Sequence, residues 1–377
     1  MKINIVVGGT FHAPILARNL IRLGHDVKIY TSTPKFKFKD KALLKNIVFV
    51  PMMFQIFRKL INKPIWSGFK YFDSVVFDWV VSKIMRDCDV VYGFAGNSYF
   101  SGVSVKQRGG KYILDRACPH VNYQNDLLIE ESKEIRVKFY SLGNRALNRS
   151  KLEYREANRI IVPSKYTYET FLGRGVDLDK IDIIPLDANA SVPQKIPKKT
   201  NTGFTVGVVG GGLLRKGYIY IFRAWDGLCI DGGKLLIKGN KSELIQSKEI
   251  QNIIKRNKNI EFVDYVEDIN DFYKECDIFC LPSIDDGFGM VVFEAMANAL
   301  PVIVTKNVGA STFVVHGENG YIVNIRSSDE LKKGILSLYK DKIKLSEFSE
   351  KSLQIYENYT NSNTSYLNSV GILFSSL

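Results

Sequence analysis

The sequence predicts an α/β protein built from two doubly wound domains, and three observations support this. Short apolar segments typical of strands alternate with segments of helical periodicity along most of the chain. The length of 377 residues suits two domains, since one domain usually has about 100–200 residues. A stretch near residues 185–203, rich in Pro, Lys, Thr and Asn, separates one alternating run from the next.

The first domain is expected to cover residues 1–190. Its strands are expected at "KINIVV", "DVKIYTS", "DVVYGF", "KYILD" and "RIIVPS". After the first strand, Pro14 stands where the first turn of a helix is expected and Gly24 where that helix ends. The order of strand, helix and strand predicts a parallel sheet with helices on both faces.

The second domain is expected to cover residues 191–355. Its strands are expected at "FTVGVVGG", "KLLIKG", "IEFVDYV", "DIFCLPS", "PVIVTK" and "GYIVN". The last segment, 356–377, is expected to pack back on the first domain. Open α/β sheets bind ligands outside the carboxyl ends of their strands, so we expect the site in a cleft between the two domains.

The composition predicts an ordinary cytoplasmic protein. Apolar residues make up 45% of the chain, but no uninterrupted apolar run reaches the roughly 20 residues that cross a bilayer. The first residues do not resemble a signal peptide. The five cysteines are scattered and form no CxxC pair, which indicates reduced thiols rather than disulfides or a zinc site.

Positive charge is concentrated in the first domain. Residues 1–190 hold 30 Lys and Arg against 18 Asp and Glu, whereas the remainder holds 22 against 21. Segment 35–70 interleaves basic and aromatic residues, which suits an anionic membrane surface or a lipid-linked acceptor. A solvated basic face without a partner is the alternative. No RNA-binding signature is present, so nucleic acid is not an expected partner.

Two glycine turns follow expected strands. The first, "GGT" at residues 8–10, predicts little beyond a tight turn. The second, "GVVGGGLLRKG" at 207–217, sets Gly211 and its neighbours before Arg215 and Lys216. Arginine binds two phosphate oxygens at once and lysine adds a point charge, so this turn is a candidate site for a diphosphate.

The stretch "PSIDDGFGMVVFEAMA", residues 282–297, contains two acids eight positions apart, Asp286 and Glu294. A helix is expected from about Met290, and its first amides would be free to bind an anion or a sugar hydroxyl. Glu294, one turn in, can accept two hydrogen bonds from a ribose diol. Asp286 lies in the turn nearer the cleft, and the side chain of Asp285 is expected to point elsewhere.

These motifs resemble the family 4 glycosyltransferases, which have the GT-B fold of two Rossmann-like domains facing across a cleft. The resemblance rests on "GGGLLRKG", "LLIKGN", "LPSIDDGFGMVVFEAMANALPVIVT" and "GASTFVVHGENGYIV", and it extends over nearly the whole chain. It implies retaining transfer of a sugar from a UDP- or GDP-sugar to a glycan or lipid-linked saccharide. It also implies that no metal or other cofactor is required, and it fits synthesis of surface polysaccharide or glycolipid.

The resemblance also implies roles for single residues. Arg215 and Lys216 match the basic pair that holds the donor diphosphate. Asp286 and Glu294 match the two acids of the E-x7-E motif, and Asp286 is one methylene shorter than the usual Glu. The further donor-binding positions are Gly9, Gly211, Gly287, Phe288, Gly289, Met290 and Val291.

Four residues of the first domain complete the candidate site. His120 matches a catalytic histidine near the donor sugar, and a structural loop histidine is the alternative. His12, Asp115 and Arg116 are candidates for acceptor binding. Asp87 and Asp89 imitate a DxD metal motif, but we interpret them as a helix end that runs into a strand.

Other functions remain open to a chain of this fold. A phosphorylase, an epimerase or a non-catalytic partner subunit would share the two-domain architecture. The presence of Arg215, Lys216 and Glu294 favours an active transferase over these alternatives.

Overall fold

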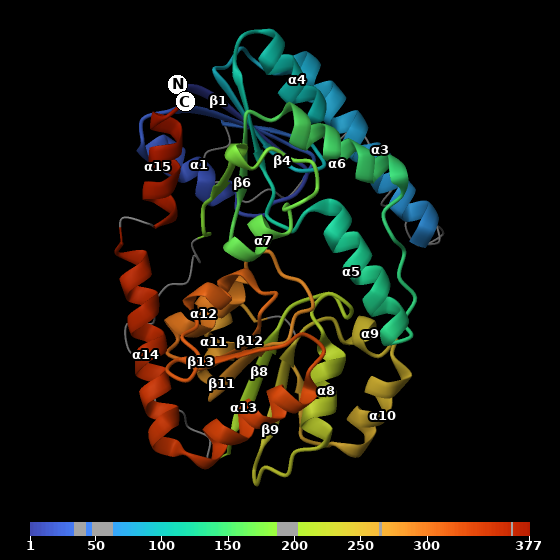
Figure 1. The fold of residues 1–377 in the computed structure, drawn as a ribbon, viewed down its shortest axis with the longest axis vertical. Helices are drawn as coiled ribbons and strands as arrows, with labels where there is room; N and C mark the ends of the chain where they lie inside the picture. Colours follow the sequence, from blue (N-terminus) through green and yellow to red (C-terminus); the bar gives the residue numbers. More distant parts are fainter. Residues whose placement is uncertain (34–42, 47–62, 187–202, 264–265, 363–364) are drawn as a thin grey trace.

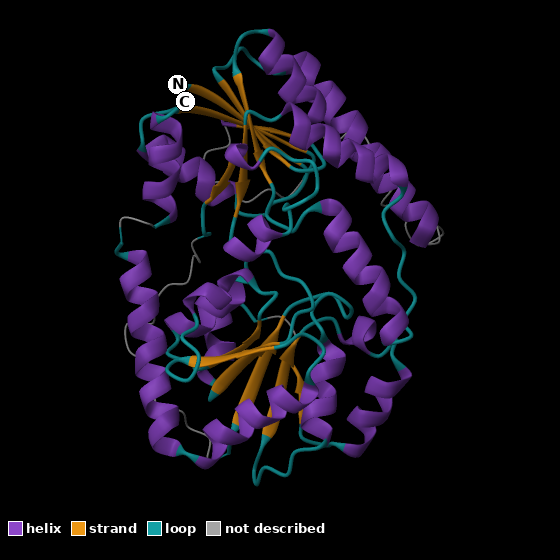
Figure 2. Ribbon diagram, in the orientation of Figure 1, coloured by secondary structure: helices purple, strands orange, loops and turns teal. Residues whose placement is uncertain are grey.

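The computed structural model describes residues 1–33, 43–46, 63–186, 203–263, 266–362 and 365–377. They form two lobes, each with one parallel sheet between layers of helices (Figures 1 and 2). The two doubly wound domains predicted from the sequence are therefore confirmed. Most of the basic segment 35–70 and of the boundary at 185–203 lies outside the described residues.

The first lobe contains a seven-stranded sheet in the order β3-β2-β1-β4-β5-β6-β7. The order reverses at β1, and such a reversal places a crevice at the carboxyl ends of the strands. Its strands are β1 (Lys2–Val7), β2 (Asp26–Thr31), β3 (Leu44–Asn46), β4 (Val90–Phe94), β5 (Lys111–Asp115), β6 (Arg159–Val162) and β7 (Ile181–Ile183). Its helices are α1 (Ala13–Arg22), α3 (Lys63–Ile84), α4 (Tyr99–Gln107), α5 (Val121–Glu134), α6 (Asn144–Glu156) and α7 (Lys165–Glu169).

The second lobe contains a six-stranded sheet in the order β10-β9-β8-β11-β12-β13. Its strands are β8 (Thr205–Val209), β9 (Lys234–Lys238), β10 (Ile260–Phe262), β11 (Ile278–Leu281), β12 (Val302–Thr305) and β13 (Gly320–Val323). The helices from there to the end of the chain are α8 (Tyr218–Asp226), α9 (Lys241–Leu244), α10 (Lys248–Arg256), α11 (Ile269–Lys274), α12 (Met290–Ala297), α13 (Ser328–Lys340), α14 (Lys342–Thr360) and α15 (Tyr366–Ser375).

The central strands are apolar because both of their faces are covered. Every residue of β4 and of β8 is buried. Such strands form continuous apolar runs rather than alternating ones, which is why their positions could be predicted from the sequence. Each strand expected from the sequence is present, whereas β3 and β7, which have three residues each, were not expected.

The last helix returns to the first lobe. Figure 1 shows α14 running along the second lobe and α15 lying beside α1. The ring of Phe374 in α15 is 5.4 Å from that of His25 and 6.4 Å from that of Tyr92. Residues 366–375 therefore pack on the first lobe. Within the described ranges, no helix is both long and apolar enough to cross a bilayer.

Candidate functional site

The glycine turn after β8 is held by backbone geometry and by one carboxylate. Gly210 and Gly212 have φ values of 142° and 98°, a backbone conformation that residues with a side chain rarely adopt. The N–H groups of Gly212 and Leu213 donate to the two carboxylate oxygens of Glu243, at 3.3 and 3.0 Å. Glu243 in α9 thus fixes the turn that precedes the two cations, a role that the sequence interpretation missed.

Two turns of the second lobe meet in a buried cluster of charges. Lys216 Nζ donates to the carboxylate of Asp286. Arg215 Nη1 lies 3.6 Å from Asp286 Oδ1 and donates to the carbonyl oxygen of Asp285 at 3.1 Å. The cluster Arg215–Lys216–Asp286 therefore joins the exits of β8 and β11 and contains two positive charges against one negative charge. The structure brings together three of the residues predicted as catalytic.

The cations keep Asp286 ionised although it is buried. Asp286 is 8% exposed and Lys216 is 7% exposed. Burial alone would raise the pKa of Asp286, but the charges of Lys216 and Arg215 outweigh it and hold the pKa below its usual value. Asp286 is thus a permanent carboxylate that fixes both cations.

Glu294 lies beside this cluster in α12. Its Oε2 accepts a hydrogen bond from the hydroxyl of Tyr273 at 2.8 Å. Burial raises the pKa of Glu294, against the opposing effects of that hydrogen bond and of the charge on Lys216. Both acids of the motif therefore experience the field of Lys216, but they have different partners and occupy different environments.

The first turn of α12 begins at a glycine with φ of 87°. A Cβ atom on Gly289 would also lie 2.7 Å from Cγ1 of Val308, so only glycine fits there. The first amides of a helix have no partner within the helix and attract anions. Met290 and Val291, which supply such amides, are only partly buried.

Other positions of the predicted donor loop instead join the two lobes. The carbonyl oxygen of Gly287 accepts hydrogen bonds from Ser164 Oγ at 2.7 Å and from Thr167 Oγ1 at 3.0 Å. A Cβ atom on Gly287 would lie 2.1 Å from the carbonyl oxygen of Ala117, so the close approach of the lobes requires glycine. The ring of Phe288 is buried and stacks on Phe293 at 5.3 Å, and its carbonyl oxygen accepts from the N–H of Ala310 at 2.6 Å.

The side chain of Asp285 points away from that of Asp286, as expected, but its contacts with the first lobe were not predicted. Its carboxylate accepts hydrogen bonds from Gln124 Nε2 and, at 3.0 Å, from the hydroxyl of Tyr166, both in the first lobe. Burial raises its pKa, although the bond from Gln124 and the charge of Arg215 act in the opposite direction. The Gln124 amide oxygen in turn accepts from Arg116 at 3.3 Å.

The acceptor candidates His12 and Asp115 form a buried pair in the first lobe. His12 Nε2 lies 2.7 Å from Asp115 Oδ2, which also accepts from the hydroxyl of Tyr92 at 2.8 Å. The His12 ring packs 5.0 Å from Phe94 and 6.1 Å from Tyr366 in α15. The third candidate, Arg116, donates to the carbonyl oxygen of Pro119 and so holds its own loop.

The structure does not join His120 to the charge cluster. Its ring is buried, with centroids 5.2 Å from that of Tyr154 and 5.1 Å from that of Phe171. Its Nδ1 accepts a hydrogen bond from the backbone N–H of Asn122 at 3.3 Å, so it caps α5. Among the described contacts of His120, none involves the second lobe. Its expected role near a donor sugar stays a prediction.

The remaining predicted donor glycines differ in the space around them. Gly9 is partly exposed after β1, and a Cβ atom on it would lie 2.7 Å from the ring of Phe11. Gly211 is exposed, with no atom within 4 Å of a Cβ built on it. Asp89 accepts from the backbone N–H of Lys2 at 2.7 Å, and Asp87 pairs with Arg108 at 3.2 Å. In the part of the chain that the structure describes, no group of three or more His, Cys, Asp or Glu is placed to hold a metal ion.

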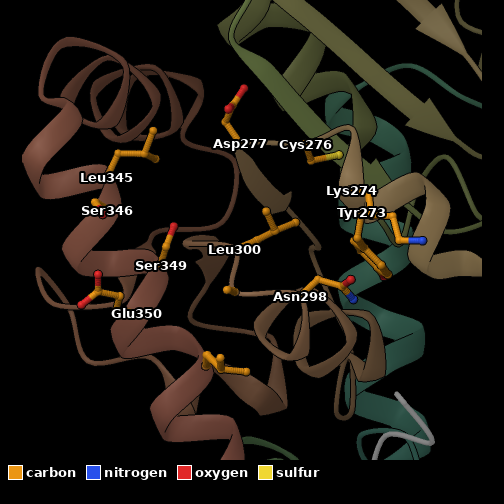
Figure 3. Close-up of a pocket in the computed structure, with 12 residues that line it drawn as sticks. Tyr273, Lys274, Cys276, Asp277, Asn298, Leu300, Leu345, Ser346, Ser349 and Glu350 are labelled. Atoms are coloured by element: carbon orange, nitrogen blue, oxygen red, sulfur yellow. The ribbon is translucent and has the colours of Figure 1, made fainter. Parts of the chain in front are cut away.

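A separate pocket of about 270 Å³ lies between the end of α11 and α14 (Figure 3). Tyr273 and Asn298 line it on one side, and Ser349 and Glu350 on the other. Neither Arg215 nor Lys216 lines this pocket. It is therefore distinct from the charge cluster, and Tyr273 separates it from Glu294.

Two family models match the chain and together extend over nearly all of it. The model described as "Glycosyltransferase Family 4" matches residues 7–186, and the model described as "Glycosyl transferases group 1" matches residues 192–354. The chain belongs to the family 4 glycosyltransferases and has the GT-B fold.

Relatives of known sequence and structure agree with this assignment. An uncharacterized glycosyltransferase of Haemophilus influenzae is 29% identical over 175 residues, 45% of this chain and 49% of that protein. The capsular polysaccharide biosynthesis glycosyltransferase CapM of Staphylococcus aureus is 29% identical over 170 residues, 44% of each chain. The matched region of this chain thus covers about half the length of each of these two relatives. HepE of Anabaena, solved in complex with UDP-glucose, shares the fold with a TM-score of 0.69 at 17% identity over the whole of both chains.

Proposed function

We propose that this protein is a retaining glycosyltransferase that moves a sugar from a UDP- or GDP-sugar to a saccharide or lipid-linked acceptor. The observation that supports it most is the pair of cations Arg215 and Lys216, both held by Asp286, together with the N-terminus of α12 after the same turn. A nucleoside diphosphate offers the negative charge that this surface lacks. The complex of HepE with UDP-glucose supports a nucleotide-sugar as the ligand of this fold.

The proposed reaction is a front-face displacement. The bond between the anomeric carbon and the diphosphate oxygen breaks while the acceptor oxygen bonds to the same face of that carbon. Arg215 and Lys216 stabilise the charge that grows on the leaving diphosphate, a kind of stabilisation that is often the largest catalytic term. An oxygen of the diphosphate takes the proton from the acceptor hydroxyl. Because the two cations compensate this charge, the proposal requires no metal or other cofactor.

The two acids of the motif have separate roles in this proposal. Glu294 accepts hydrogen bonds from the ribose hydroxyls of the donor. Asp286 fixes Lys216 and Arg215 and borders the sugar. Gly9, Gly211 and the amides of Met290 and Val291 surround the phosphates.

The acceptor is proposed to be a precursor of surface polysaccharide or glycolipid at the inner face of the membrane. CapM, whose name assigns it to capsule synthesis, supports this class. Residues 1–70 contain 13 Lys and Arg against 2 Asp and Glu, a charge that anionic lipid attracts. Co-sedimentation with anionic but not neutral vesicles at low salt is expected, and equal sedimentation with both would remove the membrane from the proposal.

The identity of the sugar donor is tested by measuring the melting temperature of the protein with each of a panel of UDP- and GDP-sugars, because a bound ligand raises it. With the best donor and an acceptor extract, release of free nucleoside diphosphate then measures transfer. Arg215→Ala should lower turnover about 10²–10³-fold. In other enzymes, removal of one hydrogen-bond donor that stabilises the transition state has an effect of this size. Arg223→Ala is the matched control, since Arg223 is in α8 and pairs only with Glu249 and the Tyr220 ring among its described contacts.

Each alternative has its own outcome in this assay. Near-normal transfer by Arg215→Ala would refute the assignment of the cluster. Release of a sugar phosphate in place of the nucleotide would indicate a phosphorylase. Binding of a donor without turnover on any acceptor would indicate a partner subunit.

A further inference from the structure

A cavity of about 370 Å³ in the first lobe lies between α6 and the segment that joins α7 to β7. Among the described residues that line it, four are basic and one is acidic, so this lining has an excess of positive charge. These charged residues are Lys151, Arg155, Arg174, Lys180 and Asp177. None of its lining residues belongs to the second lobe, so the cavity is separate from the charge cluster.

His120 is one of the residues that line this cavity. The residue is 2% exposed, and its buried Nε2 has no hydrogen-bond partner within the part of the chain that the structure describes. Because Nδ1 accepts from the N–H of Asn122, the proton of the neutral ring is on Nε2. Burial and the nearby charges of Arg116, Arg174 and Lys151 lower the pKa of His120 to about 4, so the ring is neutral at pH 7.

The cations around His120 are available to a ligand. Among the described contacts, the ammonium groups of Lys151 and Lys180 take part in no hydrogen bond or ion pair. The guanidinium of Arg174 lies 5.3 Å from the centroid of Tyr123 and donates to the carbonyl oxygen of Leu172 at 3.3 Å. The only acid in the lining, Asp177, accepts from the backbone N–H of Asp179 at 3.1 Å. Three positive charges therefore face the cavity without a carboxylate bound to them.

We propose that this cavity binds an oxyanion of the phosphate class, with the Nε2–H group of His120 as the buried donor and Lys151, Arg174 and Lys180 as the neutralising charges. A buried donor left without a partner is costly, and a phosphate oxygen satisfies it. A neutral sugar hydroxyl would satisfy His120 but would leave the three cations uncompensated. This proposal does not depend on the proposed transferase activity.

The first test compares melting temperatures in sodium phosphate and in sodium chloride of equal ionic strength. Phosphate should raise the melting temperature of the unchanged protein and of Lys83→Gln, a control that removes one exposed cation from α3. In Arg174→Gln/Lys180→Gln, phosphate should bind at least about tenfold more weakly, since charge-assisted hydrogen bonds are lost. A response that is lost in Arg215→Ala and kept in full in Arg174→Gln/Lys180→Gln would assign the phosphate to the charge cluster and overturn the proposal.

The second test observes the imidazole directly. The chain has only four histidines, so a sample labelled with ¹⁵N in histidine gives a simple spectrum. His120→Phe, which keeps an aromatic ring between Tyr154 and Phe171, identifies the His120 signal by its loss. Phosphate should shift the Nε2–H signal of His120 and leave that of the buried His12 in place. An unchanged His120 signal at saturating phosphate would overturn the proposal even if the variants fold poorly.

A third experiment distinguishes a lipid headgroup from a free phosphorylated compound as the ligand of this cavity. Neutral vesicles with and without phosphatidic acid are sedimented with the protein and with Arg174→Gln/Lys180→Gln. Binding that depends on phosphatidic acid and on these two cations assigns the cavity to a lipid headgroup. Phosphate binding in solution without such vesicle binding assigns it to a free phosphorylated compound.

Discussion

Two groups of charged residues, one in each lobe, differ in the partners of their central carboxylate. In the second lobe, Arg215 and Lys216 share the single carboxylate of Asp286, so positive charge is left over. In the first lobe, Asp115 accepts from His12 and from the hydroxyl of Tyr92, and its partners are enclosed by aromatic rings. Both groups follow strands at the carboxyl edge of a sheet. We therefore expect the group with two cations to bind an anionic ligand and the group enclosed by aromatic rings to contribute mainly to packing.

The largest expected effect on stability comes from breaking the pair of Lys216 and Asp286. Lys216→Met and Asp286→Asn should each lower the free energy of unfolding by about 3–5 kcal/mol, because each leaves a buried charge without its main partner. The double variant should lose less than the sum of the two. Urea unfolding of the four proteins gives the coupling energy of the pair.

The exposed pair of Lys274 and Asp271, 2.8 Å apart in α11, is the matched control. Exposed pairs contribute about 0–1 kcal/mol, so the same cycle there should give little coupling. If the two cycles gave equal coupling energies, Lys216 and Asp286 would be solvated in solution and the cluster would not be the buried site described above.

The second prediction concerns the pair of His12 and Asp115 in the first lobe. Asp115→Asn should lower the free energy of unfolding by about 1–3 kcal/mol, since two hydrogen bonds to a buried carboxylate are weakened. Tyr92→Phe removes one of the two donors and should cost about half as much. Urea unfolding measures both variants.

Transfer assays show whether the comparison between the two lobes holds. If Asp115→Asn loses stability but its KM for the acceptor does not rise selectively, the result would support a structural role for the pair of His12 and Asp115. Normal stability with a strongly raised KM for the acceptor would return His12 and Asp115 to the acceptor-binding role expected from the sequence.

The sequence predicts the architecture and the cluster well because both depend on local patterns. Buried parallel strands form apolar runs, and Arg215, Lys216 and Asp286 lie in the loops that follow two such runs, β8 and β11. Contacts between distant segments are not encoded in this way. Nothing near His120 in the chain indicates that its ring packs between Tyr154 and Phe171, and nothing near Gly287 indicates the carbonyl oxygen of Ala117 beside it.

The adjacent acids Asp285 and Asp286 show the same limit most clearly. The sequence predicts that the side chain of Asp285 points away from that of Asp286, but it does not identify the partners of either. The structure directs one to Lys216 and the other to Gln124 and Tyr166 in the first lobe. Their pKa values consequently move in opposite directions, down for Asp286 and up for Asp285.

The smallest predicted effect follows from these opposite shifts and is a difference in the slope of stability against pH. A carboxyl whose pKa is lowered by folding, as for Asp286, adds stability above its unfolded pKa of about 3.9, and this is lost as the pH falls through the folded value. A carboxyl whose pKa is raised, as for Asp285, adds most stability below about pH 3.9, and its contribution declines as the pH rises toward the folded value. Asp286→Asn should therefore remove a rising slope below about pH 4 and Asp285→Asn a falling slope above it. Urea midpoints of the two variants and the parent, measured from acid to neutral pH, give the slopes, and difference curves of the same sign would show that the two acids share one environment.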